Sequence, residues 1–270
     1  MKLVSFRPLA SSQAQVTGYL HTPITEMAVR REAYPTVVLC PGGAYAMCSQ
    51  READPVALRF FARGYQVFTL LYSTGAAARD FQPLAELSET FRLIRERAGE
   101  YWADPARVAV CGFSAGGHLA ASLGTLWDHP EFLRRRGDFQ GKNRPDAMIL
   151  CYPVILADQF AHVESLRNVS GCEPRDPGYE FFSLERHVGP HTPPAFLWHT
   201  LEDASVPVEN SLQMLSALGR AGVPAEAHFL PQGSHGLSVC TQESGTPDPY
   251  NARWMDWCLD WLDKTFAYQL

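Results

Sequence analysis

A serine flanked by two glycines stands at the point where a buried strand gives way to a helix. Residues 108–111 are apolar, as is typical of a strand buried on both faces, and residues 117–124 favour a helix. Between them, the pattern Gly-x-Ser-x-Gly holds Ser114 on a tight turn with its hydroxyl pointing outward. The positive end of the helix dipole then lies where negative charge develops during acyl transfer. We predict that Ser114 is a nucleophile; the alternative is an ordinary turn whose serine caps the helix.

A serine hydroxyl needs a histidine as general base, and the histidine needs a carboxylate to orient it. Because the carboxyl ends of parallel strands meet at one edge of a sheet, these partners are expected in loops that follow strands. Residues 232–236 follow an expected strand and place His235 between glycines. Residues 201–207 follow another expected strand and contain both Glu202 and Asp203. His235 is the predicted base, whereas spacing alone does not decide between the two carboxylates.

Acyl transfer also needs backbone N–H groups directed at the developing oxyanion. The amide of Ala115, directly after the candidate nucleophile, is one expected donor. The other is expected from Gly43 or Ala44, in the Pro-Gly-Gly-Ala-Tyr loop of residues 41–45 that follows an early buried strand. Glycines there let the backbone approach a substrate without a Cβ in the way. A plain Pro-Gly-Gly turn is the alternative interpretation.

Strands that alternate with helices are expected to position these residues. This order predicts an α/β fold with a mostly parallel central sheet, helices on both faces and an antiparallel hairpin at one edge. Residues 155–193 are the least regular part and are expected to form a short cap insertion over the active site. No repeat or linker divides the chain, so residues 1–270 are predicted to form a single domain. The expected strands are 3–9, 15–21, 35–40, 65–72, 108–111, 146–153, 194–200 and 225–230, and the expected helices are 54–63, 83–99, 117–124, 208–221 and 250–266.

The composition is that of an ordinary globular protein with a sizeable core. The chain has 270 residues, of which 46% are hydrophobic and 19% charged, and its formal net charge is −6. Without a basic stripe for phosphates, a nucleic-acid partner is not expected. No segment reaches transmembrane length and the N-terminus lacks the apolar region of a signal peptide, so a cytoplasmic location and no membrane partner are predicted. Seven cysteines without a Cys-x-x-Cys pair, and no His-Glu-x-x-His motif, predict free thiols and no metal site.

Four motifs, in chain order, resemble the α/β-hydrolase superfamily. They are residues 41–45, residues 112–118, Asp203 with Val206-Pro207, and residues 233–236. More narrowly, they resemble its bacterial esterase branch, which includes acetyl xylan esterases and other carbohydrate esterases. In that family the acid lies four residues before the proline of Asp-x-x-Val-Pro, which implies that Asp203 rather than Glu202 is the acid. The family's oxyanion loop is often His-Gly-Gly-Gly; here Pro41 replaces the histidine, so Gly43 and Ala44 both stay candidates for the second donor.

The resemblance implies a serine carboxylesterase with a triad of Ser114, Asp203 and His235 and no cofactor. Its expected substrates are small-molecule, short-chain acyl esters, in particular O-acetyl groups on xylan-type oligosaccharides. Tyr45 is the candidate for substrate binding, by stacking on a sugar ring, with packing in the core as the alternative. A second enzyme class, an amide or peptide hydrolase of the arylformamidase or dipeptidyl-peptidase type, would use the same triad. A hydrolase fold kept only as a binding module is the third interpretation.

Overall fold

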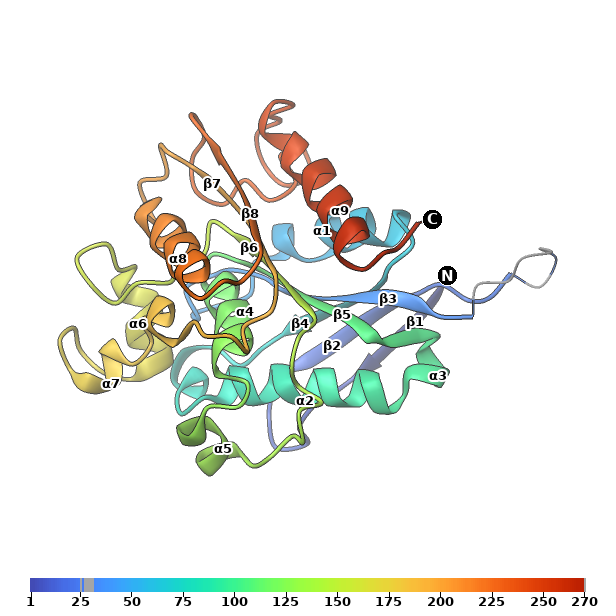
Figure 1. Cartoon of the computed structure of the whole chain (residues 1–270), viewed down its shortest axis with the longest axis horizontal. Coiled ribbons are helices and arrows are strands. Elements are labelled where there is room, and N and C mark those ends of the chain that lie inside the picture. Colours follow the sequence, from blue (N-terminus) through green and yellow to red (C-terminus); the bar gives the residue numbers. More distant parts are fainter. Residues whose placement is uncertain (25, 27–31, 270) are drawn as a thin grey trace.

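The computed structural model describes residues 1–24, 26 and 32–269, and within them the chain forms one eight-stranded sheet (Figure 1). The strands are β1 (Lys2–Phe6), β2 (Gln15–Leu20), β3 (Tyr34–Cys40), β4 (Gln66–Leu71), β5 (Ala103–Phe113), β6 (Ala147–Cys151), β7 (Ala195–Thr200) and β8 (Ala225–Leu230). They lie in the order β1-β2-β4-β3-β5-β6-β7-β8. The pairs β1–β2 and β2–β4 are antiparallel, and the other pairs are parallel. The predicted α/β fold with an antiparallel edge hairpin is confirmed.

Helices connect the strands in the predicted alternation. They are α1 (Asp54–Ala62), α2 (Gln82–Glu96), α3 (Ala98–Tyr101), α4 (Ala115–Leu126), α5 (Pro130–Arg136), α6 (Val163–Ser170), α7 (Pro177–Glu180), α8 (Glu209–Arg220) and α9 (Trp254–Thr265). Short 3-10 turns are η1 (Gln50–Glu52), η2 (Gly75–Ala78), η3 (Leu184–His187) and η4 (Asn251–Arg253). Among the described residues, no helix combines the length and the apolar character that crossing a lipid bilayer requires.

Two strand boundaries differ by three residues or more from those expected from the sequence, and helix α2 ends three residues earlier and α9 begins four residues later than expected. The first strand ends at Phe6 rather than at residue 9, because pairing with β2 runs only from Lys2 to Phe6. Strand β5 starts at Ala103, well before residue 108, because Ala103 already pairs with Tyr34. The register between β3 and β5 then shifts between Tyr34 and Thr36, at Pro35. A proline has no N–H to donate to a sheet, so it is tolerated inside a strand mainly at such an irregularity.

The sheet is buried because helices cover both of its faces (Figure 1). Helices α1 and α9 pack on one face, where Phe60 and Trp254 meet alternate β3 residues such as Leu39. Helices α2, α4 and α8 pack on the other face, where Phe91 and Leu119 share a core with Val38. Every residue of β3 is buried, as expected for a central strand between two helix layers. This double cover holds the carboxyl ends of the parallel strands in fixed positions along one edge.

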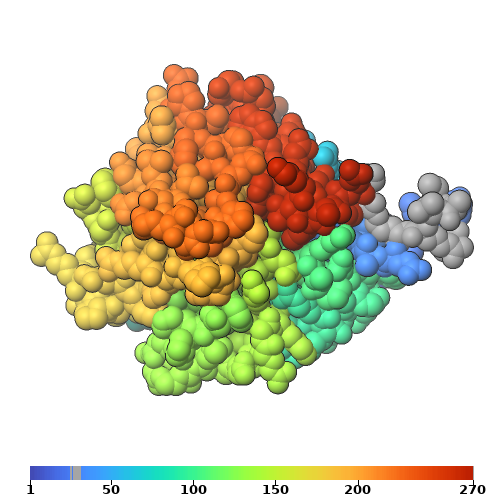
Figure 2. Space-filling view, in the orientation of Figure 1, coloured from blue at the N-terminus to red at the C-terminus, as the bar shows by residue number. Residues whose placement is uncertain are grey.

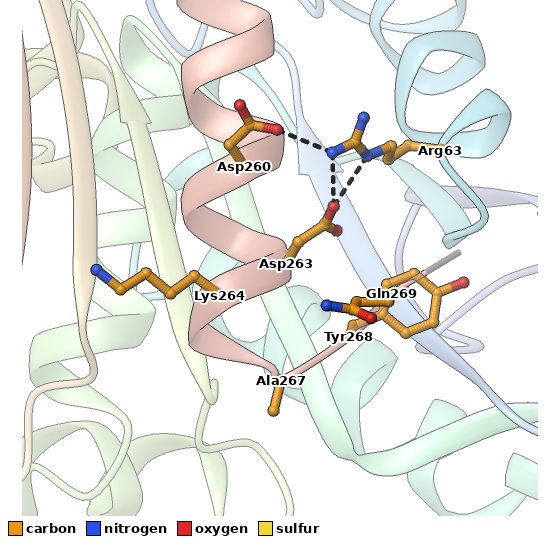
Figure 3. A pocket seen from close by; sticks show the side chains of 7 residues that line it. All are labelled: Arg63, Asp260, Asp263, Lys264, Ala267, Tyr268 and Gln269. Atoms are coloured by element: carbon orange, nitrogen blue, oxygen red, sulfur yellow. Dashed lines mark hydrogen bonds and ion pairs between the residues drawn. The ribbon is translucent and has the colours of Figure 1, made fainter.

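The C-terminal helix is tied to the end of α1 by ion pairs at the surface. The Arg63 guanidinium lies 2.8 Å from Oδ1 of Asp260, and its Nε donates to Oδ2 of Asp263 at 2.9 Å (Figure 3). These groups line a cavity of about 600 Å³. Among the residues that the structure describes, none of the candidate catalytic residues lines it. The Arg63 side chain is 42% exposed, so such pairs contribute at most about 1 kcal/mol each.

Residues 155–193 are more helical than expected, since they contain α6, α7 and η3. The segment closes on itself through the N–H of Leu184, which donates to the carbonyl of Ile155 at 3.0 Å. It also contacts the loop after β3, because the side-chain amide of Asn168 donates to the carbonyl of Ala44 at 2.8 Å. Figure 2 shows the segment, in yellow to orange, as part of one continuous surface with α8 and α5.

The turn that carries Ser114 requires glycine on both sides. A Cβ at Gly112 would lie 2.0 Å from the carbonyl oxygen of Gly116, and a Cβ at Gly116 would lie 2.0 Å from the carbonyl oxygen of Cys40. Both obstacles are backbone atoms, which cannot rotate away as a side chain can. The start of α4 therefore packs against the ends of β5 and β3 at the closest distance that backbones allow.

We expect Gly116→Ala to lower the free energy of unfolding by at least about 3 kcal/mol, because the new methyl group forces α4 away from β3. Urea denaturation followed by circular dichroism measures the change. Gly219→Ala in α8 is the matched control, since nothing lies within 4 Å of the Cβ it would add. That control is expected to be neutral or slightly stabilising, by up to about 1 kcal/mol. Equal destabilisation of both variants would contradict this account of the turn.

Candidate active site

Three loops at the carboxyl edge of the sheet bring a serine, a histidine and an aspartate together. Ser114 follows β5, Asp203 follows β7, and His235 lies in the loop after β8. The Ser114 hydroxyl lies 2.8 Å from Nε2 of His235. The Nδ1 of His235 lies 2.6 Å from Oδ2 of Asp203. With its Nδ1–H donated to the carboxylate, the imidazole has Nε2 free to accept the serine proton.

The backbone of Ser114 adopts a conformation that few non-glycine residues tolerate. Its φ is 54° and its ψ is −119°, so the side chain is turned out of the strand as the helix begins. The neighbouring β6 end compensates for this strain. The N–H of Ser114 donates to the carbonyl of Cys151, and its own carbonyl accepts from the N–H of Val154, both at 3.0 Å. These bonds hold the backbone of Ser114 in this conformation, from which the hydroxyl reaches His235.

The carboxylate of Asp203 is fully buried and receives four hydrogen bonds. Oδ1 accepts from the backbone N–H groups of Ser205 and Val206, both at 2.9 Å. Oδ2 faces the rings of His235 and His199. Burial by itself raises the pKa of Asp203, but the bonds from His199 and His235 outweigh it and hold the pKa well below its usual value. The group is therefore an anion at neutral pH.

His199 supports this carboxylate from inside the core, in a tautomer that its neighbours dictate. Its Nε2 lies 3.2 Å from Oδ2 of Asp203 and 3.0 Å from the carbonyl of Val206, so it must carry the proton. Its Nδ1 then accepts from the Ser211 hydroxyl at 2.8 Å. No motif marks His199 in the sequence, where it follows four apolar residues near the end of a strand.

Glu202, the other carboxylate that spacing left open, lies outside this arrangement. Its side chain accepts a hydrogen bond from the backbone N–H of Gly233 at 3.3 Å. Among the described residues, it forms no hydrogen bond with the imidazole of His235. The residue is exposed, whereas Asp203 is buried. The geometry therefore agrees with the assignment of Asp203 that the family resemblance implies.

The expected oxyanion donors lie around Ser114. Gly43 and Ala44 line the same cavity as Ser114 and His235, and Ala115 is the first residue of α4. Gly43 has φ 126° and Ala44 has φ 56°, so the loop is turned sharply. Within the described residues, neither N–H of these two has an acceptor, which leaves both free to face a ligand. The structure brings all three candidates to the site without choosing between Gly43 and Ala44.

Tyr45 lies in the core instead of in the cavity, which corrects its expected role in stacking on a substrate. Its side chain is 1% exposed, and its hydroxyl lies 2.9 Å from Nδ1 of His118. The Nε2 of His118 lies 3.1 Å from the carbonyl of Phe182, an acceptor, so Nε2 carries the proton and Nδ1 accepts from the tyrosine. A ring this buried cannot stack on a sugar. It supports the loop of residues 41–45 from below.

His118 makes the stability of the protein depend on pH. Burial lowers the pKa of His118 to about 4, from an ordinary value near 6.5. The unfolded chain therefore binds one more proton than the folded protein between these values, and stability falls by about 3 kcal/mol as pH drops through that window. We expect His118→Phe to be less stable at pH 7 but to lose much less stability between pH 7 and pH 4. Urea denaturation at several pH values measures the free energy of unfolding of both proteins. If this free energy falls equally in wild type and His118→Phe between pH 7 and pH 4, the prediction is wrong.

A cavity of about 390 Å³ opens over Ser114 and carries polar side chains that sequence motifs do not reveal. His162 and Glu164, at the start of α6, bring the 155–193 segment into contact with it. Arg51 and Ser205 line it from the loops after β3 and β7. Arg51, His162 and Glu164 lie outside the motifs and Ser205 is a variable position of Asp-x-x-Val-Pro, so only the folded chain reveals them. Across residues 1–24, 26 and 32–269, no group of three or more His, Cys, Asp or Glu side chains is placed to hold a metal ion.

Comparisons with known proteins identify the family of this chain. Residues 24–218 match the BD-FAE family model. Endo-1,4-beta-xylanase B of Butyrivibrio fibrisolvens is 38% identical over 234 residues, which are 84% of this chain and 35% of that protein. An acetylxylan esterase of Xylanibacter ruminicola is 31% identical over 215 residues, which are 76% of this chain and 41% of that protein. The chain thus spans about two fifths or less of the length of these two relatives.

Solved structures extend the likeness to the whole described fold. The crystal structure of an acetyl ester-xyloside bifunctional hydrolase from Caldicellulosiruptor lactoaceticus is 33% identical, with a TM-score of 0.81. The alignment covers 98% of this chain and 92% of that one. Since the family match also spans more than half of the sequence, the chain belongs to the BD-FAE family and has the α/β-hydrolase fold.

Proposed function

We propose that this chain is a serine carboxylesterase in which Ser114 is the nucleophile, His235 the general base and Asp203 the orienting acid. The observation that carries the proposal is the unbroken series of hydrogen bonds from Ser114 through His235 to Asp203, at 2.8 and 2.6 Å. The serine end of the series lies in a cavity that Gly43 and Ala44 also line, and the N–H groups of these two residues have no acceptor among the described residues. Relatives that are named as esterases support the same chemistry.

In the first half of the reaction, Ser114 Oγ attacks the ester carbonyl while His235 Nε2 takes the hydroxyl proton. The buried charge of Asp203 stabilises the imidazolium that forms. The negative oxygen of the tetrahedral intermediate lies near the amides of Ala115 and of Gly43 or Ala44, at the positive end of α4. When the intermediate collapses, His235 gives its proton to the leaving alcohol, and an acyl-serine remains.

In the second half, water takes the place of the alcohol. His235 accepts a proton from the water as its oxygen attacks the acyl carbon, and the same amides hold the second oxyanion. The bond to Ser114 Oγ then breaks, the serine regains its proton from His235, and the carboxylic acid departs. Every step uses groups of this chain and water, so no cofactor enters the proposed reaction.

The proposed substrate is a short-chain ester, in particular an O-acetyl group on a xylan-type oligosaccharide. A cavity of about 390 Å³ is small for a ligand site, and small-molecule sites span about 300–1,000 Å³. Its polar lining of Arg51, His162 and Glu164 suits hydroxyl groups better than a long acyl chain. The acetylxylan esterase among the relatives supports this choice of substrate.

Hydrolysis of p-nitrophenyl acetate, butyrate and octanoate, beside release of acetate from acetylated xylo-oligosaccharides, tests the proposal. We expect fast turnover of the acetate, a steep fall with acyl length, and acetate released from the sugar. A preference for the octanoate, or no sugar deacetylation, would contradict the substrate and leave a general carboxylesterase. Faster cleavage of a formyl-anilide or aminoacyl-anilide than of every ester would instead favour the amide-hydrolase class.

A further inference from the structure

Glu52 is a buried acidic residue close to the proposed triad but outside it. It is the last residue of η1, it is 2% exposed, and its side chain reaches the cavity of Ser114. Burial raises the pKa of Glu52, so the protein keeps an acid where its charge is costly. Its two carboxylate oxygens form hydrogen bonds to two different parts of the site.

One oxygen holds the oxyanion loop, which we define as residues 41–45. Oε2 of Glu52 accepts the backbone N–H of Gly42 at 2.8 Å. The fit is close: a Cβ at Gly42 would lie 2.7 Å from this oxygen and 2.9 Å from Cβ of Ser114. The bond therefore fixes the Pro41–Gly42 peptide next to the nucleophile. This peptide leads directly into Gly43 and Ala44, the two candidate oxyanion donors.

The other oxygen holds the histidine loop, which we define as residues 233–238. Oε1 of Glu52 accepts the hydroxyl of Tyr152 at 2.7 Å, and that hydroxyl accepts the backbone N–H of Ser238 at 2.9 Å. The ring of Tyr152 also meets the imidazole of His235 edge-on, with centroids 5.0 Å apart and an interplanar angle of 70°. Tyr152 thus forms one wall against His235 and ties down the end of its loop.

A carboxylate can accept a hydrogen bond from both loops at once. Gly42 and Tyr152 each donate a hydrogen to Glu52, and each oxygen of a carboxylate accepts. A glutamine of the same shape offers one accepting oxygen and one NH₂ group. If its oxygen keeps the bond to Gly42, its NH₂ faces the Tyr152 hydroxyl, which then has to accept and must turn its own hydrogen away from residue 52. An apolar side chain would leave the N–H of Gly42 buried without a partner.

We infer that Glu52 is a positioning residue that couples the oxyanion loop to the histidine loop and so sets the distance between the oxyanion donors and His235. The inference rests on the proposed function, because it assigns these two loops their catalytic parts. Glu52 acts through Gly42 and Tyr152 and does not itself transfer a proton to substrate. Its contribution belongs to the transition state, where donor and base must be aligned together.

Glu52→Gln, compared with Glu86→Gln, tests the inference in the full chain. Glu86 is 0% exposed and accepts from both the N–H and the hydroxyl of Ser73, so it is equally buried and bonded but touches neither loop. We expect Glu52→Gln to lower kcat for p-nitrophenyl acetate about 30-fold, somewhat less than the loss of one oxyanion donor, with KM within about threefold. Glu86→Gln is expected to keep kcat within about threefold of wild type, although both variants lose stability.

A double-mutant cycle separates a bridge from two independent contacts. Tyr152→Phe removes the hydroxyl and leaves the bond between Glu52 and Gly42, and it is expected to lower kcat about tenfold. If the two loops are coupled through Glu52 and Tyr152, the double variant should be within about threefold of Glu52→Gln alone. If the fold losses in kcat of the two single variants multiply in the double variant, the two contacts are independent and the coupling is overturned. Tyr152→Phe also serves as the milder variant if Glu52→Gln fails to fold.

A readout without substrate separates this inference from the proposed function. We expect Glu52→Gln to shift the NMR resonances of the Ser238 amide and the His235 ring, and Glu86→Gln to leave both in place. Wild-type protein with no more esterase activity than Ser114→Ala would overturn the proposed function. If Ser114→Ala abolishes activity but Glu52→Gln retains wild-type kcat, the proposed function stands and the inference is overturned. An unmoved Ser238 resonance in Glu52→Gln would also overturn it.

Discussion

Ser114→Ala is expected to lower kcat/KM for p-nitrophenyl acetate by at least about a thousandfold while the protein stays folded. The substitution removes only the atom that forms the acyl bond. The backbone at this position is strained, with φ 54° and ψ −119°, but serine already carries a Cβ there, so alanine adds no further strain. The backbone bonds to Cys151 and Val154 are also kept. Residual hydrolysis would come from water held near the oxyanion donors.

The measurement combines steady-state kinetics with labelling by a fluorophosphonate probe. Wild-type protein is expected to be labelled on one residue, and Ser114→Ala is expected not to be labelled. Ser216→Ala, an exposed serine on α8, is the control and should match wild type in both assays. Circular dichroism and the thermal midpoint of each variant show whether the fold is kept. Activity that survives in Ser114→Ala would show that another residue is the nucleophile.

Asp203→Asn is expected to lower kcat by about a thousandfold or more, because it changes the tautomer of His235. Oδ1 of Asp203 accepts two backbone N–H groups, so the oxygen of the asparagine will stay on that side. Its NH₂ group must then face His235 and donate to Nδ1. The imidazole proton moves to Nε2, the atom that has to accept the proton of Ser114. The same NH₂ also meets the N–H of His199, which adds a loss of stability.

Glu202→Gln provides a matched control one residue away. Glu202 is exposed and bonds only weakly, at 3.3 Å, to the backbone of Gly233. Its replacement is expected to change kcat by less than about threefold, as is usual for a surface group without a role in the reaction. Kinetics on acetate esters at several pH values compare the two variants. A larger loss in Glu202→Gln than in Asp203→Asn would exchange their roles and contradict the proposed triad.

The elbow and the alternation of strands with helices could be predicted from the sequence because short-range effects determine them. The apolar run before Gly112 forms a buried strand wherever helices cover both faces, and Gly112 is required by the nearby backbone of Gly116. The contact that requires Gly116 is with Cys40 on the adjacent strand, and only the folded chain shows it. The predicted strand-end positions of Ser114 and His235 follow from the same rule, since parallel strands share one carboxyl edge. Resemblance to a family added the identity of the acid.

Residues far apart in the chain decide the rest, and no local pattern describes them. Asp203 contacts a histidine 32 positions away, and Glu52 contacts a tyrosine 100 positions away. Tyr45, expected to contact substrate, is buried because its hydroxyl finds His118, 73 positions away.

The sequence by itself determined the α/β fold, the elbow with Ser114 and the loops that carry its partners, because strand burial, helix starts and glycine turns depend on neighbouring residues. Only the tertiary structure decided which side chains face the cavity, and it alone shows His235 against Asp203, the carboxylate that the family resemblance had indicated. It alone placed Glu52 between two loops, because hydrogen bonds between distant segments exist only after the sheet has brought those segments together.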